Sequence, residues 1–297
     1  MPDARITADR TVFGIGIAFV SFLILSSADA LTKILSARYS VFQVATVDAI
    51  FALAVALPVL VRQDGIARLL PRRPWIVALR SLAGAGSLML AFLSFANIPL
   101  ADAYSIAFLT PLAVTALSAP VLGEQVGWRQ WLAVVIGFGA VIAILNPSFD
   151  GIGLGQLYML ASAALFAVNM LMLRRISKTE SNSALLLLYF VMLFLIALPV
   201  ALTQWQAPGL ADLGLMALTG ICSGLGNLLL IVAFRYAAAA IVSSFMYTQL
   251  VWGAVFGLLL FGDRPDLITI GGAAIIMLCG IYTLAHTSRA ARAMAGA

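Results

Sequence analysis

The tetrapeptide "ALPV" at residues 56–59 occurs a second time at residues 197–200, 141 positions further along the chain. Three other short matches lie around this pair in the same order and at nearly the same offset: "GIG" at 14–16 with "GLG" at 153–155, "GAGS" at 84–87 with "GLGN" at 224–227, and Gly123-Glu124 with Gly262-Asp263. Each match alone is weak in so apolar a chain. Together they predict that one structural unit is present twice.

The composition indicates a membrane protein. Of the 297 residues 63% are hydrophobic and only 10% are charged, whereas about 25% charged residues is usual in soluble proteins. A membrane-spanning helix needs about 20 mostly apolar residues. Ten stretches meet that need, at about 12–36, 41–61, 74–96, 101–121, 128–145, 154–174, 183–204, 210–235, 239–261 and 267–285. We therefore expect an all-α polytopic protein with ten transmembrane helices and no soluble catalytic domain.

The two units are predicted to cross the membrane in opposite directions. Their offset spans five helices, and because five is odd the second unit starts from the other side. The loop charges agree, since the segment 62–73 carries four Arg and its counterpart near 205–212 carries none. Inverted repeats of this kind are typical of secondary transporters, which bind substrate where the repeats meet.

This interpretation divides the chain into four parts. We expect a cytoplasmic N-terminal segment at 1–11, a first five-helix repeat at 12–145, a second, inverted repeat at 154–285 and a cytoplasmic tail at 286–297.

The basic residues predict the orientation in the membrane. With the N-terminus inside, only Lys33, Arg38 and Arg264 of the 17 Lys and Arg lie outside, which leaves fourteen inside. Lys and Arg favour cytoplasmic loops, so both termini are expected in the cytoplasm and the protein in a bacterial inner membrane. The net charge of +5 follows from this topology and from attraction to anionic lipid, and nucleic acid is not an expected partner. Ala28-Asp29-Ala30 resembles a signal-peptide cleavage site, but the repeat needs this helix.

Each half closes on an apolar helix, a Gly-acid pair and a last Gly-bearing helix, "VLGEQVGWRQWLAVVIGFGAVIAIL" at 121–145 and "LLFGDRPDLITIGGAAIIMLCGIYTL" at 259–284. These segments resemble the EamA repeats of the drug/metabolite transporter superfamily, over essentially the whole chain. Within it the chain looks most like the bacterial YddG-like amino-acid exporters. The resemblance implies alternating access, export of small metabolites and no enzyme activity. The acid that follows Gly in this family is matched by Glu124 in the first half and is shortened to Asp263 in the second.

The third and eighth helices carry matching small and polar residues. Arg80, Gly84 and Ser87 match Gly220, Gly224 and Asn227, and spacings of four and three place each trio on one helical face. Ser87 and Asn227 are candidates for substrate contact, and Gly84 and Gly224 are candidate hinges. The alternative is small-residue packing between helices. Arg80 is expected to extend to the membrane edge, to pair with Glu124 or to attract a substrate carboxylate.

The fourth and ninth helices carry a second matching set near mid-membrane depth. The substrate-contact candidates on these helices are Tyr104, Phe108, Thr110, Ser244, Tyr247 and Gln249. Phe108 and Tyr247 are counterparts, so two rings are expected to flank one site, unless the ring of Phe108 faces lipid or core. Pro111 frees the carbonyl of Ala107, which predicts a hinge there or, alternatively, a static kink.

Charged and amide side chains within the spans are further candidates, because polar groups in lipid usually serve function or pair with one another. Asn169, counted among the substrate contacts, aligns with Asp29. Asp29 and Lys33 stand four residues apart and are expected to pair. Asp29, Lys33, Asp48 and Arg80 thus form the set for an ion pair or a proton site.

The function predicted from these observations is export of amino acids, including apolar and aromatic ones, and related small metabolites by alternating access. The alternative is a broad-specificity efflux carrier for drugs or cationic metabolites. An intramembrane enzyme is disfavoured because the single histidine, His286, lies past the last span. No cofactor and no metal site are expected, and Cys222 and Cys279 lack metal-ligand spacing.

Overall fold

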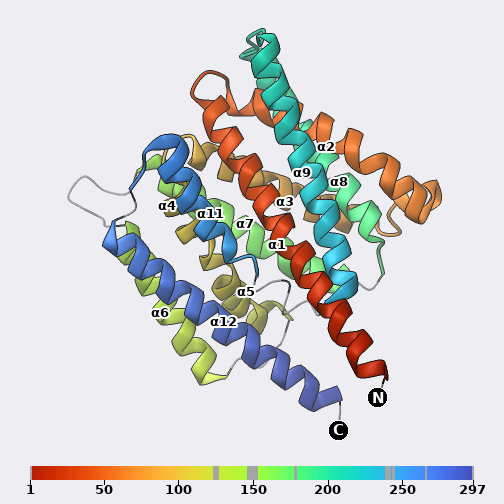
Figure 1. Ribbon diagram of the computed structural model, residues 1–297, viewed down its shortest axis with the longest axis vertical. Helices are drawn as coiled ribbons and strands as arrows, with labels where there is room; N and C mark the ends of the chain where they lie inside the picture. The colour runs from red at the N-terminus through yellow and green to blue at the C-terminus, as the bar shows by residue number, and fades with distance from the viewer. Residues whose placement is uncertain are drawn as a thin grey trace.

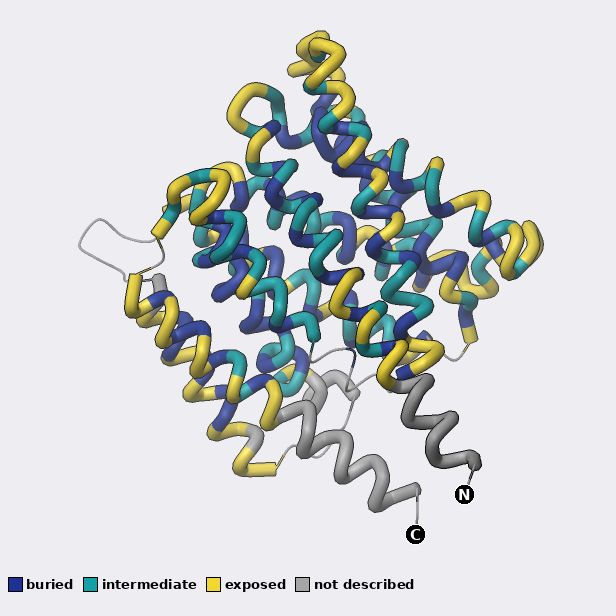
Figure 2. Tube along the Cα trace, viewed as in Figure 1, coloured by how far each residue is buried: buried dark blue, intermediate teal, exposed yellow. Residues whose placement is uncertain are grey.

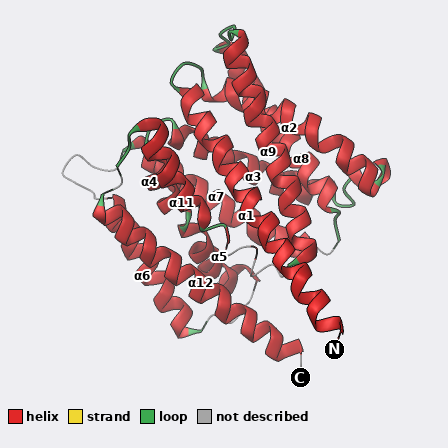
Figure 3. Ribbon diagram, viewed as in Figure 1, coloured by secondary structure: helices red, strands yellow, loops and turns green. Residues whose placement is uncertain are grey.

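The computed structural model describes residues 2–122, 127–145, 153–176, 179–237, 242, 245–264 and 266–295. Within these ranges the protein is helical and no strand occurs (Figures 1 and 3). The first half contains α1 (Pro2–Ser36), α2 (Val41–Asp64), η1 (Ile66–Leu69), α3 (Pro74–Phe95), α4 (Leu100–Ala107), α5 (Leu109–Leu122) and α6 (Trp128–Leu145). The second half contains α7 (Leu154–Ile176), α8 (Asn182–Thr203), α9 (Leu210–Tyr236), α11 (Thr248–Phe256), η2 (Gly257–Phe261) and α12 (Leu267–Ala295).

The helices agree with the ten expected spans. By length and composition seven helical segments of the described chain can cross a membrane, and α4 with the start of α5 counts as one of them. Three shorter apolar helices, at Trp131–Ala143, Thr248–Phe261 and Leu267–Tyr282, fall where the remaining three spans were expected. The fold is therefore that of an all-α polytopic membrane protein, as predicted.

The packing repeats itself as two inverted halves require. Helix α1 packs against α9, and its counterpart α7 packs against α3, the counterpart of α9. A similar hydrogen bond occurs in both contacts, because Ser21 Oγ donates to Gly226 O at 2.8 Å and Ser162 Oγ donates to Ser87 O at 2.8 Å. The pairs α2–α8 and α6–α12 each join an element to its own counterpart. These two pairs therefore lie around the pseudo-twofold axis.

Helices α2 and α9 approach each other unusually closely because α9 carries glycines where they touch. A Cβ added to Gly220 would collide with the carbonyl oxygen of Asp48. A Cβ added to Gly224 would lie 2.7 Å from the carbonyl oxygen of Ala52 and 3.0 Å from its Cα. Contacts this short with backbone atoms would force the two helices to shift, so the close approach depends on glycine. Small residues at helix contacts are a common means of packing helices in lipid.

Hydrogen bonds connect the links between helices at both ends of the bundle. At the end that holds the start of α1 and the end of α12 (Figure 1), the buried Glu180 carboxylate accepts the backbone N–H groups of Arg72 and Arg73, both at 2.8 Å. At the opposite end the Tyr39 hydroxyl donates to Asp212 at 2.7 Å. This bond raises the pKa of Tyr39, because the carboxylate favours the protonated phenol.

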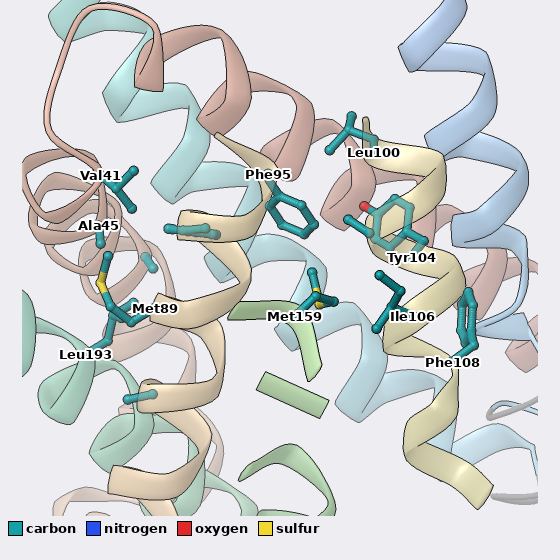
Figure 4. Close-up of a cluster of buried hydrophobic side chains, with 14 of the residues drawn as sticks. Val41, Ala45, Met89, Phe95, Leu100, Tyr104, Ile106, Phe108, Met159 and Leu193 are labelled. Carbon is teal, nitrogen blue, oxygen red and sulfur yellow. The ribbon is translucent and has the colours of Figure 1, made fainter. Parts of the chain in front are cut away.

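The interior is filled by apolar and aromatic side chains from both halves. Figure 4 shows Phe95 and Tyr104 turned toward each other, and their ring centroids are 5.7 Å apart. The buried residues run through the middle of the bundle, whereas exposed ones gather toward its outside and its ends (Figure 2). Many exposed side chains are large and apolar, such as Leu259 on η2 and Leu278 on α12. An apolar exterior suits a lipid environment.

The predicted break in the fourth span is present, but proline is not its only cause. Helix α4 ends at Ala107, and α5 begins two residues later at Leu109, which agrees with the loss of an amide donor at Pro111. In the second repeat Leu250 replaces this proline, yet Met246 and Tyr247 form a turn and α11 begins only at Thr248. There the Leu250 amide donates to Tyr247 O at 3.2 Å rather than to Met246. The inverted fold therefore places a break at both positions.

Candidate transport site

A buried carboxyl group on α2 faces α9 across their close contact. Asp48 is 0% exposed, and its Oδ1 accepts a hydrogen bond from Ser223 Oγ at 2.7 Å. Its other oxygen, Oδ2, has no hydrogen-bond partner in the described part of the chain. A buried polar group without a partner costs free energy. An acceptor that is free and surrounded by protein is therefore a candidate contact for a positively charged ligand group.

Arg80 on α3 and Tyr189 on α8 lie nearby. Arg80 Nη1 donates to Leu185 O at 3.1 Å, while its buried Nε has no partner among the described residues. Tyr189 is close enough to interact electrostatically with both Arg80 and Asp48. The structure thus places a donor group and an acceptor group within electrostatic reach of one phenol.

Asn169 on α7 completes this cluster, which we call the polar centre (Asp48, Arg80, Asn169 and Tyr189). The side chain is 1% exposed, and its Oδ1 finds no partner within the described residues. It packs against Gly84, where an added Cβ would lie 3.1 Å from Asn169 Oδ1 and 3.2 Å from Tyr189 Cδ2. The four residues come from α2, α3, α7 and α8, so both repeats build the polar centre.

The expected ion pair between Asp29 and Lys33 is absent from the described residues. Lys33 Nζ instead pairs with Asp263 Oδ2 at 3.2 Å, and Asp29 Oδ2 accepts the Tyr104 hydroxyl at 2.5 Å. The prediction was wrong because the spacing of four considers α1 alone, whereas both side chains reach across to other helices. For Asp48 too, no cationic partner is found in the described chain. Pairing of Arg80 with Glu124 concerns a residue outside the described ranges.

The two aromatic counterparts come together, as the repeat suggested. The ring centroids of Phe108 and Tyr247 are 4.9 Å apart with an interplanar angle of 38°. Both side chains are buried, and the Tyr247 hydroxyl has no partner in the described part of the chain. The rings stand at the two helix breaks, one in each repeat. They therefore form an aromatic contact near mid-span between the halves.

The remaining candidates occupy varied positions. Ser87 is buried and bonded to Ser162 between α3 and α7, at 2.9 Å to the carbonyl oxygen, so its hydroxyl serves helix packing. Asn227 Nδ2 donates within its own helix to Ser223 O at 2.9 Å. Thr110 is buried and Gln249 is half-buried, each just after a helix break. Ser244 lies outside the described residues.

The candidate hinges Gly84 and Gly224 do not interrupt their helices. Helix α3 runs unbroken from Pro74 to Phe95 and α9 from Leu210 to Tyr236. Gly224 serves the close contact with α2, which is the packing alternative considered for the glycines.

Sequence reasoning missed Tyr189 and Ser223. A signal for Tyr189 was available, because the offset of 141 set by "ALPV" makes it the counterpart of Asp48. Counterparts near a pseudo-twofold axis meet in space, as Phe108 and Tyr247 also do. Ser223 gave no comparable signal, because its side chain matters only through the contact of α9 with α2.

These features define a class of protein. A ten-span bundle of two inverted halves, with polar and aromatic groups buried where the halves meet, is the architecture of a secondary transporter. Comparison with known proteins agrees: the sequence model of the EamA-like transporter family matches residues 12–146 and again residues 153–285. The chain belongs to this family. It is accordingly a transporter of small metabolites.

Several curated relatives are similar over nearly their whole length. The S-adenosylmethionine uptake transporter of Rickettsia bellii is 27% identical over 93% of this chain and 95% of its own. The pseudopaline exporter CntI of Pseudomonas aeruginosa is 30% identical, covering 90% and 94%. The riboflavin transporter of Rhizobium johnstonii is 28% identical, covering 82% and 80%. One solved crystal structure, 18% identical, has a TM-score of 0.64 and covers 95% of this chain and 99% of that chain, which shows the shared fold.

Proposed function

We propose that the protein carries α-amino acids, with apolar and aromatic ones included, and exports them across a bacterial inner membrane by alternating access. The observation that supports this most is a pair of buried atoms without a partner in the described chain, Asp48 Oδ2 and Arg80 Nε, whose residues both interact electrostatically with Tyr189. An α-amino acid carries one positive and one negative group, so it needs one acceptor and one donor. The polar centre offers both.

In this proposal the substrate ammonium binds Asp48 Oδ2. The Ser223 hydroxyl, bonded to Oδ1, holds the carboxylate in place. The substrate carboxylate accepts from Arg80 Nε, the donor without a partner in the described chain, close to Tyr189. Hydrogen bonds with an ionised partner are roughly twice as strong as neutral ones, so these two contacts supply most of the selectivity for the amino-acid group.

The substrate side chain is expected on the aromatic side of the site. Phe108 and Tyr247 present ring faces at the helix breaks, and such rings favour apolar and aromatic partners. The unpartnered hydroxyl of Tyr247 in the described chain allows a polar side chain as well. A range of amino acids is therefore expected rather than a single one.

The relatives support this substrate class. One is named for uptake of S-adenosylmethionine, a molecule that ends in an α-amino acid group. Another is named an exporter, so the family contains carriers that work in both directions. The placing of both termini in the cytoplasm rests on the distribution of Lys and Arg.

The test uses three molecules with the same ring in liposomes that contain the purified protein. Phenylalanine carries both charged groups, phenethylamine lacks the carboxylate and 3-phenylpropionate lacks the amine. We expect uptake of phenylalanine, with Asp48→Asn weakening its apparent affinity about 10- to 100-fold, the range for a lost hydrogen bond to a charged group. Asp212→Asn, at the end of the bundle, is the matched control and should transport normally.

A second candidate is a carrier of cationic metabolites, and one observation favours it. Asp29 and Asp48 are electrostatic neighbours, so in this region of the described chain two carboxyl groups accompany one guanidinium group, that of Arg80. Phenethylamine uptake equal to that of phenylalanine would establish this candidate and contradict the amino-acid proposal. Failure of all three molecules would contradict both.

A further inference from the structure

Two charged side chains on one face of α1 reach across to helices of the fourth and ninth spans. Asp29 accepts the Tyr104 hydroxyl of α4. One turn further on, Lys33 Nζ pairs with Asp263, which follows η2, at 3.2 Å. The same ammonium group donates to Ile98 O at 2.9 Å, in the link between α3 and α4. Helix α1 is thus joined by side chains to both neighbouring segments.

The Lys33–Asp263 pair is partly shielded from solvent. The side chains are 15% and 27% exposed, and Lys33 Nζ also lies 4.7 Å from the ring centroid of Phe261. Exposed ion pairs contribute little because water screens them. A pair that is covered and has two further contacts is held more firmly, so it can keep two helices together.

The backbone fixes Asp263 in position. Helix η2 ends at Gly262 with a φ of 70°, a left-handed conformation that glycine adopts readily. The Asp263 amide then donates to Gly257 O at 2.9 Å. The carboxylate is therefore presented toward α1 by a well-defined turn rather than by a loose loop.

The Lys33–Asp263 pair connects two groups of helices, each of which is also held together by side-chain contacts of its own. One group consists of α1, α2, α3, α7, α8 and α9, which pack against one another. Within it, at this end of the bundle, Arg38 of the α1–α2 link pairs with Asp212 of α9 at 3.5 Å. Thr269 of α12 bonds Asp102 of α4 at 3.0 Å, which ties elements of the other group, α4, α5, α6, α11, η2 and α12. Among the described residues, Lys33 is the one that connects the groups by an ion pair.

We propose that the Lys33–Asp263 pair is the latch of the outer gate, and that substrate leaves between α1 and the α11–η2 segment when the pair opens. This inference rests on the proposed carrier function. Two groups of helices that rock about a central site must separate at one end while they close at the other. Here the separation requires Lys33 to release Asp263, Ile98 and the ring of Phe261. The hydrogen bond between Tyr104 and Asp29 lies one helical turn below the latch, toward the middle of α1.

The test measures access to a buried position below the latch. Ser26 lies on α1, is fully buried and stands seven residues, about 10 Å, below Lys33. Ser26→Cys, in a chain with Cys222→Ala and Cys279→Ser, is labelled in intact cells with a membrane-impermeant thiol reagent. Lys33→Asp places two acids opposite each other and should raise the labelling rate about 5-fold or more. The swap of both charges, Lys33→Asp with Asp263→Lys, should bring the rate back toward that of the parent.

The controls separate a gate from a general loss of packing. Arg38→Gln breaks the other ion pair at this end and should leave the labelling rate unchanged, because both its elements belong to one group. Lys33→Gln is the milder variant if Lys33→Asp does not reach the membrane. Unchanged labelling in the Lys33 variants, or equal labelling in the single and the swapped chain, would overturn the latch. Labelling needs no substrate, so this result is independent of whether amino acids are transported.

Discussion

At the level of one residue, the hydrogen-bond partner of Asp48 could not be predicted from the sequence pattern. The position of Asp48 in an apolar span indicated a structural or functional partner, and the two expectations were an ion pair and a proton site. The structure instead gives it a serine from a helix 175 positions away in sequence. Such a partner depends on how α2 and α9 approach, which a local pattern does not contain.

The bond from Ser223 to Asp48 gives a prediction for stability. Ser223→Ala leaves both oxygens of the buried carboxyl without a partner in the described chain, so the free energy of unfolding should fall by about 1–3 kcal/mol. The control is Ser27→Ala, whose hydroxyl bonds Leu23 O within its own helix. Thermal unfolding of the purified variants measures the difference. Equal midpoints for the two variants would show that the Asp48 contact contributes nothing.

At the level of the element, the helix breaks correct an expectation about Pro111. From the sequence, Pro111→Leu should straighten the fourth span and slow substrate exchange. The second repeat already has leucine at this position, Leu250, and is still interrupted. We therefore expect Pro111→Leu to keep the break at Phe108 and to exchange substrate at close to the wild-type rate. Slow exchange with an unchanged melting temperature would restore the proline as a hinge.

The glycine contact between α2 and α9 gives a prediction with an internal control. Gly224→Ala forces a methyl group against the backbone of Ala52 and should destabilise the protein by about 1–3 kcal/mol, as overpacking does. Gly214→Ala on the same helix meets nothing within 4 Å and should be neutral or slightly stabilising. Melting temperatures of the two variants decide the matter, and a Gly224→Ala chain as stable as the Gly214→Ala chain would contradict the close contact.

At the level of the whole molecule, most of the architecture could be predicted and only part of the site. Long apolar runs indicate the membrane spans directly, and repeated motifs such as "ALPV" indicate the two halves. Both are local features of the chain. The contact between Phe108 and Tyr247 could be predicted for the same reason. The ion pair between Lys33 and Asp263 could not be predicted, because these residues are 230 positions apart and are not counterparts in the repeat.

The proposed transport mechanism requires two homologous halves that cross the membrane in opposite directions around one site. The opposite orientation of the halves is tested by labelling single cysteines placed at Ala67 and Gly209, which are both exposed. The parent chain for this experiment lacks Cys222 and Cys279. These positions follow the second helix of each repeat, so inverted halves must present them to opposite sides. A membrane-impermeant thiol reagent should reach position 67 only from the cytoplasm and position 209 only from outside. Labelling of both from the same side would contradict the inverted repeat and the alternating-access mechanism built on it.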